Sequence, residues 1–216
     1  MRETASLAAN LTAAAGPAAE INLYRRGGVI CRQGDPAGHI FQLKSGIAIR
    51  HVTRADGRRQ VMDLLLPGDF FGFAAGPEYC STAESICDGT AVTSYRRERI
   101  QASMPPGLWR AAVEALARLE DHIRVTGRTT ACEKVGTLLL ALERRLSDQP
   151  RDLRLPVSRY DIADYLAISV ETVSRALANL KRQGLIRLTG PRAVKILDPT
   201  ALEAGEGRSP TRAQWT

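Results

Sequence analysis

The chain has 216 residues, enough for one large domain or two modest ones, and its 44% hydrophobic content suffices to bury a core in each, which excludes a wholly disordered chain. The formal net charge of +7 is compatible with a polyanionic partner. The first twenty residues hold no continuous apolar run of a signal peptide, and no segment approaches the length of a membrane span, so we expect a cytoplasmic protein without a membrane partner.

Residues 1–21 are rich in Ala, and we expect a flexible N-terminal extension. From residue 22 to residue 105, Gly, Asp and Pro mark turns at regular intervals, with short runs rich in Val, Ile, Leu and Phe between them. Examples of these runs are residues 40–43, 47–52 and 60–66. Short strands between regular turn signals predict an all-β sandwich or barrel.

After residue 105 the composition becomes helical, and one long helix is predicted over residues 106–131. Residues at alternating spacings of three and four form a heptad-like seam on it: Trp109, Ala112, Leu116, Leu119, Ile123, Thr126 and Thr130. We expect two chains to pair in parallel along this seam. The alternative is a monomer in which the stripe packs on the chain's own barrel. A second helix is expected from about residue 131 to residue 146.

Two short helices joined by a tight turn are predicted between Ser158 and Gly184. Ser158 and Asp161 match a capping box at the start of the first helix. The turn falls at residues 167–168, Ser169 caps the second helix, and Gly184 provides a left-handed stop. This arrangement is typical of a helix-turn-helix and points to DNA.

The outward face of the second helix carries Glu171, Ser174 and Arg175 at positions i, i+3 and i+4. Arg175 can donate two hydrogen bonds to guanine O6 and N7, and Glu171 can accept one from the amine of cytosine or adenine. Ser174 suits a base or a phosphate. The alternative is that Glu171 and Arg175 form an ordinary solvated ion pair on an exposed helix.

Residues 185–197 alternate in polarity around a Gly-Pro turn and predict a β-hairpin, so we expect a winged helix-turn-helix domain over residues 132–199. Residues 151–197 carry nine Arg or Lys against four Asp or Glu, the uneven positive charge expected for binding a polyanion. Contacts to the DNA backbone are expected from Arg159, Ser169, Thr172, Arg192 and Lys195. Residues 200–216 are predicted to be a disordered tail.

The order of these parts and three motifs resemble the CRP/FNR family of bacterial transcription regulators, over nearly all of residues 22–197. The motifs are similar to those of the FNR and FixK branch and lie at residues 56–60, 66–72 and 161–175. The resemblance implies an α+β fold: an N-terminal cyclic-nucleotide-binding-type β-barrel (jelly roll), a long dimerisation helix and a C-terminal winged helix-turn-helix. It also implies a homodimeric activator that binds double-stranded promoter DNA at an inverted repeat and contacts RNA polymerase. In that branch the Glu, Ser and Arg at the positions of Glu171, Ser174 and Arg175 read a TTGA-type half-site.

Departures from the family pattern concern the signal. Members that bind a cyclic nucleotide hold its ribose with a Gly-Glu pair and its phosphate with Arg-Ser or Arg-Thr. Here Gly72 is followed by Phe73, and Ser81 and Thr82 stand at the phosphate position, so the pocket is degenerate and cyclic AMP is not expected. Residues 1–30 lack the cysteines that hold an iron–sulfur cluster in oxygen-sensing members. We therefore predict a regulator without a cofactor.

Other signals stay open as alternatives. The four cysteines, Cys31, Cys80, Cys87 and Cys132, form no CxxC pair, fit reduced thiols and are interpreted as buried small hydrophobes, with a redox-active thiol among them as the alternative. The three histidines, His39, His51 and His122, fit no haem-ligand motif. Haem, thiol oxidation or a small-molecule effector in the barrel are therefore alternatives to an effector-independent protein.

An enzyme is not expected. A cupin-type metal site needs clustered histidines near the Pro-Gly-Asp turn, and no histidine lies between His51 and His122. The sequence contains neither a nucleophile elbow nor a phosphate-binding loop, and no metal ligands are predicted. The alternative of another class is a ligand-binding module whose C-terminal domain contacts a protein instead of DNA. A steep salt dependence of binding would favour DNA.

Overall fold

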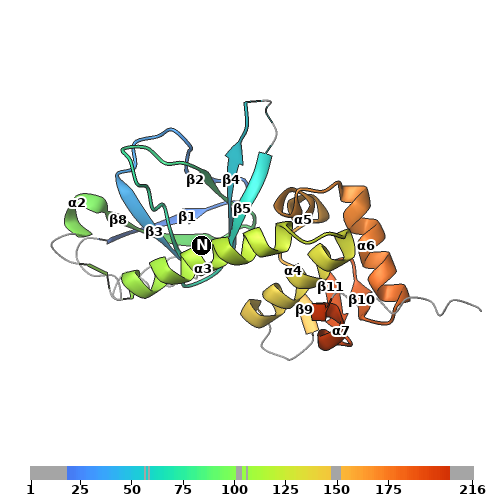
Figure 1. Cartoon of the computed structure of the whole chain (residues 1–216). Helices are drawn as coiled ribbons and strands as arrows, with labels where there is room; N and C mark the ends of the chain where they lie inside the picture. The colour runs from blue at the N-terminus through green and yellow to red at the C-terminus, as the bar shows by residue number, and fades with distance from the viewer. Residues whose placement is uncertain are drawn as a thin grey trace, which may run out of the picture. The chain divides into compact units, whose positions relative to one another are not determined.

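The computed structural model describes residues 19–55, 57, 59–100, 104–105, 107–146 and 152–204. The chain divides into two compact units, with the boundary between Glu120 and Asp121 (Figure 1). Of the helices described, none combines the length and the apolar content needed to cross a membrane.

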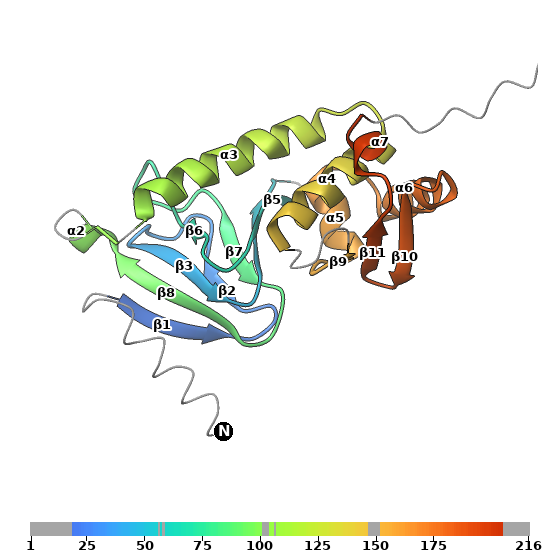
Figure 2. The ribbon, with the colours of Figure 1, turned by 90° about the horizontal axis from the view of Figure 1, so that it is seen from below.

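Among the described residues of the first unit, eight short strands form two four-stranded sheets, in the orders β1-β8-β3-β6 and β2-β7-β4-β5 (Figure 2). Every pairing in these sheets is antiparallel. The strands are β1 (Ala19–Tyr24), β2 (Val29–Cys31), β3 (His39–Ser45), β4 (Ala48–Thr53), β5 (Arg59–Leu65), β6 (Phe70–Phe71), β7 (Thr82–Ser85) and β8 (Thr90–Arg96). The predicted all-β barrel of the cyclic-nucleotide-binding type is confirmed.

The core of this unit is formed by buried aromatic and aliphatic side chains from both sheets. The rings of Phe41 and Phe71 stack with their centroids 5.3 Å apart, and Leu43 and Leu65 are fully buried beside them. Gly46 lies between β3 and β4 with a φ of +82°, and a Cβ there would lie 2.7 Å from the Cα of Thr90. The close approach of the two sheets at this turn therefore requires glycine.

Helix α3 (Leu108–Thr126) follows the short helix α2 (Arg97–Ile100) and has two distinct faces. On the inner face, Leu108 and Ala111 pack with Ile40 and Phe70 of the barrel. On the outer face, large apolar side chains stay exposed at spacings of four, three and seven residues: Trp109, Val113, Leu116 and Ile123. Of the expected seam, Ala112, Leu119 and Thr126 are partly buried beside this exposed stripe.

The prediction that one helix carries the seam as far as Thr130 is wrong. Helix α3 ends at Thr126, and Thr130 instead caps the next helix. The hydroxyl of Thr130 accepts a hydrogen bond from the backbone N–H of Glu133 at 3.2 Å, and the Glu133 carboxylate accepts one from the N–H of Thr130 at 3.1 Å. This reciprocal cap starts a new helix and breaks the old one.

The second unit contains the remaining helices and one antiparallel sheet of order β10-β11-β9. Helix α4 packs its buried leucines against the elements that follow it, chiefly α6 and α7. The elements are α4 (Ala131–Leu146), β9 (Asp152–Arg154), α5 (Arg159–Leu166), α6 (Val170–Arg182), β10 (Ile186–Gly190), β11 (Ala193–Ile196) and α7 (Pro199–Ala204). The predicted winged helix-turn-helix is confirmed, and the second predicted helix has the expected bounds.

Two expected boundaries need correction. The disordered tail was predicted to begin at residue 200, but α7 continues to Ala204, because Leu202 is buried and packs against Gly136 of α4. The flexible extension was predicted to end at residue 21, but β1 begins at Ala19 and pairs with β8. The rest of both segments, residues 1–18 and 205–216, lies outside the described residues.

Candidate nucleic-acid interface

Helix α5 begins with the predicted capping box. The hydroxyl of Ser158 accepts a hydrogen bond from the N–H of Asp161 at 3.2 Å, and the Asp161 carboxylate accepts one from the N–H of Ser158 at 3.0 Å. Ile162, Ala163 and Leu166 are buried, as the apolar pattern predicts. The cap therefore fixes where α5 starts, and the buried residues fix its rotation.

The turn between α5 and α6 is held by a strained residue. Ala167 has φ 53° and ψ 46°, and among the described non-glycine residues it alone has a positive φ. Its N–H and that of Ile168 both donate to the carbonyl of Ala163, which closes the turn. A side chain in the left-handed region costs free energy, and this residue ends α5 so that α6 can start three residues later.

Helix α6 has the two faces that the sequence predicts. Ser169 accepts a hydrogen bond from the N–H of Thr172 at its start, and Gly184, with a φ of +74°, follows its end. The inner face is fully buried and consists of Val173, Ala176, Leu177 and Leu180. On the outer face Glu171 and Arg175 are exposed and Ser174 is half-buried. The three side chains occupy the N-terminal half of the helix, on the side away from the core.

Glu171 stays ionised on this surface. Its pKa lies below the ordinary value, because the carboxylate accepts a hydrogen bond from its own backbone N–H, with smaller contributions from Ser169 and from the positive charge of Arg175. An ionised carboxylate is an acceptor only. It suits the amine edge of a cytosine or an adenine.

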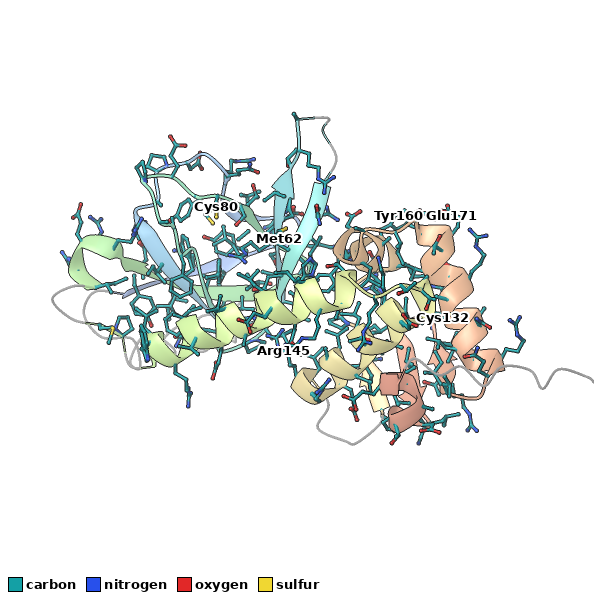
Figure 3. The ribbon with its side chains drawn as sticks, viewed as in Figure 1. Met62, Cys80, Cys132, Arg145, Tyr160 and Glu171 are labelled. Atoms are coloured by element: carbon teal, nitrogen blue, oxygen red, sulfur yellow. The ribbon has the colours of Figure 1, made fainter. Side chains whose placement is uncertain are left out.

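Arg159 links the start of α5 to the outer face of α6. Its guanidinium donates to the hydroxyl of Ser174 at 3.1 Å. Arg159 and Arg192 also line one recess of about 320 Å³ between α5 and the hairpin turn, together with Tyr160. Tyr160 is 69% exposed, and in Figure 3 it projects from the same edge of this unit as Glu171. Tyr160 was not among the predicted contacts, although its place outside the inward stripe of α5 could have indicated it.

The hairpin of β10 and β11 forms the predicted wing, with Pro191 and Arg192 exposed at its turn. Lys195 lies on β11, and its ammonium is 3.7 Å from the carboxylate of Asp152 on β9. Strand β9 was not predicted. Its three residues are too few for a periodic signal, and they become a strand by pairing with β11.

The residues of the degenerate nucleotide pocket make internal contacts. Phe73 packs on the apolar cluster of Ile40 and Phe70. Ser81 is buried, and the Thr82 hydroxyl accepts a hydrogen bond from the N–H of Gln33 at 3.1 Å. These residues do not fit a cyclic nucleotide, because Phe73 offers no acceptor to a ribose and no guanidinium stands at the phosphate position.

The four cysteines are free thiols. Cys31 is buried, and burial raises its pKa to about 11, so it is a poor nucleophile. Cys80 is exposed, contrary to the interpretation that all four are buried, while Cys87 and Cys132 are half-buried and hydrogen-bonded through sulfur to Ile47 and Asn179.

The three histidines lie on three different elements. His39 lies on β3, His51 is buried on β4, and His122 on α3 packs edge-on against the ring of Tyr165 with the centroids 4.3 Å apart. In the part of the chain that the structure describes, no three His, Cys, Asp or Glu side chains gather as metal ligands would.

Comparison with known protein families matches both units. Residues 133–204 match the Crp-like helix-turn-helix domain, and residues 21–102 match the cyclic nucleotide-binding domain.

Relatives cover most of the chain. The nitrogen fixation regulation protein FixK of Rhizobium meliloti (strain 1021) is 39% identical over 181 residues, which are 84% of this chain and 84% of that protein. The transcriptional activatory protein AadR of Rhodopseudomonas palustris is 35% identical, over 80% of this chain and 75% of its own. The solved structure of FixK2 from Bradyrhizobium japonicum superposes with a TM-score of 0.77 and 36% identity, covering 86% of this chain and 96% of that one.

Proposed function

The chain belongs to the CRP/FNR family of transcription regulators, with FixK-type relatives and a DNA-binding helix-turn-helix, and we propose that it acts as a homodimeric activator on an inverted repeat of a TTGA-type half-site. It is not an enzyme, since its relatives are regulators. The observation that carries the proposal is the outer face of α6, where Glu171, Ser174 and Arg175 project together from a helix whose other face is buried.

Base recognition is assigned to these three residues, and backbone contacts to Arg159, Ser169, Thr172, Arg192 and Lys195. The hydrogen bond from Arg159 to Ser174 supports a shared role, because a guanidinium held there is oriented before a phosphate arrives. The Ser169 and Thr172 hydroxyls, 3.0 Å apart at the start of α6, stand where a helix N-terminus favours a phosphate.

Dimerisation is assigned to the exposed stripe of α3. Trp109 and Ile123 are 73% and 70% exposed, and soluble monomers rarely leave such large side chains in a row. Their spacing suits a parallel pair of helices. A dimer would also match an inverted repeat, because each half-site would meet one α6. We expect the bound dimer to contact RNA polymerase, as an activator does.

Effector-independent binding is part of the proposal. Support comes from the barrel, where Phe73 and Thr82 use their side chains on internal partners instead of offering them to a nucleotide. The dimer would then be competent for DNA as synthesised.

The test is a fluorescence-anisotropy titration of reduced, ligand-free protein against a duplex carrying TTGA-N6-TCAA and against a scrambled duplex, at several salt concentrations. We expect tight, selective binding that weakens steeply with salt, since phosphate contacts release counterions. Weak binding to both duplexes would refute effector independence and direct the search for a signal to the barrel.

The dimer itself is tested by Leu116→Asp, which places a charge in the middle of the exposed stripe. We expect sedimentation equilibrium to show a monomer with an unchanged circular dichroism spectrum, and half-site selectivity to weaken. An unaltered dimer would exclude the α3 stripe as the interface.

A further inference from the structure

The face of α3 that packs on the barrel begins with apolar side chains and then carries a charged one. Leu108 and Ala111 begin this face, and seven residues after Ala111, two helical turns further on, the same face carries Arg118. Only 13% of the Arg118 side chain is exposed. A guanidinium buried at a contact between a helix and a barrel is costly unless it is paired.

Two carboxylates pair with this guanidinium. Nε of Arg118 lies 3.3 Å from Oδ2 of Asp63, and Nη1 lies 3.2 Å from Oδ1 of Asp69. The Asp63 and Asp69 side chains are 6% and 12% exposed, so all three groups are shielded from water. The second terminal nitrogen, Nη2, is buried without a hydrogen-bond partner among the described residues. Arg118, Asp63 and Asp69 together form an ion cluster.

Both carboxylates are anchored to different sheets of the barrel. Asp63 lies on β5, in register with Arg50 of β4. Asp69 lies in the turn before β6, where its Oδ2 accepts a hydrogen bond from the N–H of Leu66 at 2.7 Å and its carbonyl accepts one from the N–H of Leu43 at 2.9 Å. Because neither carboxylate is free to follow a moving helix, the ion cluster ties α3 to both sheets at once.

We propose that Arg118 is a positioning residue for dimerisation, whose pairing with Asp63 and Asp69 fixes the rotation of α3 on the barrel and so the direction in which the exposed stripe faces a second copy. A rotation by one residue turns Arg118 by about 100°, and a slip by one turn moves it by about 5.4 Å. Either change breaks both ion pairs. A single polar residue in an apolar helix contact sets register in this way, at a cost in stability.

The inference rests on the homodimer of the proposed function and gives Asp69 of the 66–72 motif a role. Apolar packing at Leu108 and Ala111 alone is non-directional and tolerates small rotations of the helix, whereas two ion pairs of fixed geometry do not. Trp109, Val113 and Leu116 of the outer stripe lie on the same helix and in the same unit as Arg118, so their direction follows that of Arg118.

The test compares Arg118→Met with Arg110→Met in the full chain. Arg110 is a matched control, because it lies on α3 and pairs with Glu114 at 3.5 Å, but with the two side chains 83% and 58% exposed. Sedimentation equilibrium gives the dimer dissociation constant, and anisotropy on the TTGA duplex gives the affinity for DNA. We expect Arg118→Met to raise the dimer dissociation constant about tenfold or more, and Arg110→Met to leave it within about twofold.

A triple variant separates positioning from plain stability. Asp63→Asn and Asp69→Asn, added to Arg118→Met, remove the two carboxylate charges that the guanidinium neutralises in the wild type. Thermal stability should recover while the dimer dissociation constant stays raised. Recovery of both would overturn the proposal, because the excess negative charge at Asp63 and Asp69 would then be the whole effect. Equal dimer constants for wild type and Arg118→Met would also overturn it and leave the proposed function intact. A wild-type monomer that does not select the TTGA duplex would overturn both.

Discussion

Replacing Ala167 by glycine should stabilise the protein. Ala167 closes the turn between α5 and α6 in the left-handed region, with φ 53° and ψ 46°, and its side chain is exposed. An L-residue with a Cβ costs roughly 1–2 kcal/mol there, and glycine does not. Glycine loses up to about 1 kcal/mol more backbone entropy on folding. The difference is a gain that spans roughly 0–1.6 kcal/mol and is centred at about 0.8 kcal/mol, with no packing lost.

Urea unfolding of the full chain measures this change as a higher midpoint with an unchanged slope. The control is Ala178→Gly, the same substitution at an exposed position inside α6, where helical backbone makes glycine cost about 1 kcal/mol. The two variants should therefore move the midpoint in opposite directions. If Ala167→Gly destabilises the chain as Ala178→Gly does, the argument from backbone strain is refuted.

Three further predictions concern DNA binding and pH. Arg175→Ala should cost roughly 1–3 kcal/mol at one guanine and relax selectivity there, measured by anisotropy on single-base variants of the half-site; equal losses at every base would contradict base recognition. Arg159→Ala should weaken binding to all duplexes alike and lower the salt slope by about one, whereas an unchanged slope would exclude a phosphate contact. Burial lowers the pKa of His122, so the unfolded chain, in which a histidine titrates near about 6.5, takes up this proton more readily than the folded protein. The free energy of unfolding should therefore have its full value above about pH 6.5 and decrease below it. His122→Phe should reduce the decline in urea midpoint between about pH 7.5 and 5.5; an identical decline in this variant would show that other groups cause it.

The helix-turn-helix could be predicted from the sequence because its signals are local. The capping box of Ser158 and Asp161 spans four residues, and the buried face of α6 repeats at intervals of three and four. The left-handed stop at Gly184 depends on one residue type. Contacts of this range are encoded in neighbouring residues, so the pattern predicts them without the rest of the fold.

Long-range pairing was decided by the tertiary structure. Arg118 pairs with Asp63 and Asp69 across about fifty residues of chain, and the local sequence around either acidic residue does not indicate an arginine partner on a distant helix. Thr130 matches the heptad spacing of α3 but caps α4, because Glu133 completes a capping box with it. Helix α7 exists because Leu202 is buried against Gly136. Periodicity and caps in the sequence determine where the long helices and the strands form. The pairing of a buried charge and the formation of a short helix are decided only when distant segments meet. The physical reason is that the free energy of burial arises from the contact and not from either segment alone.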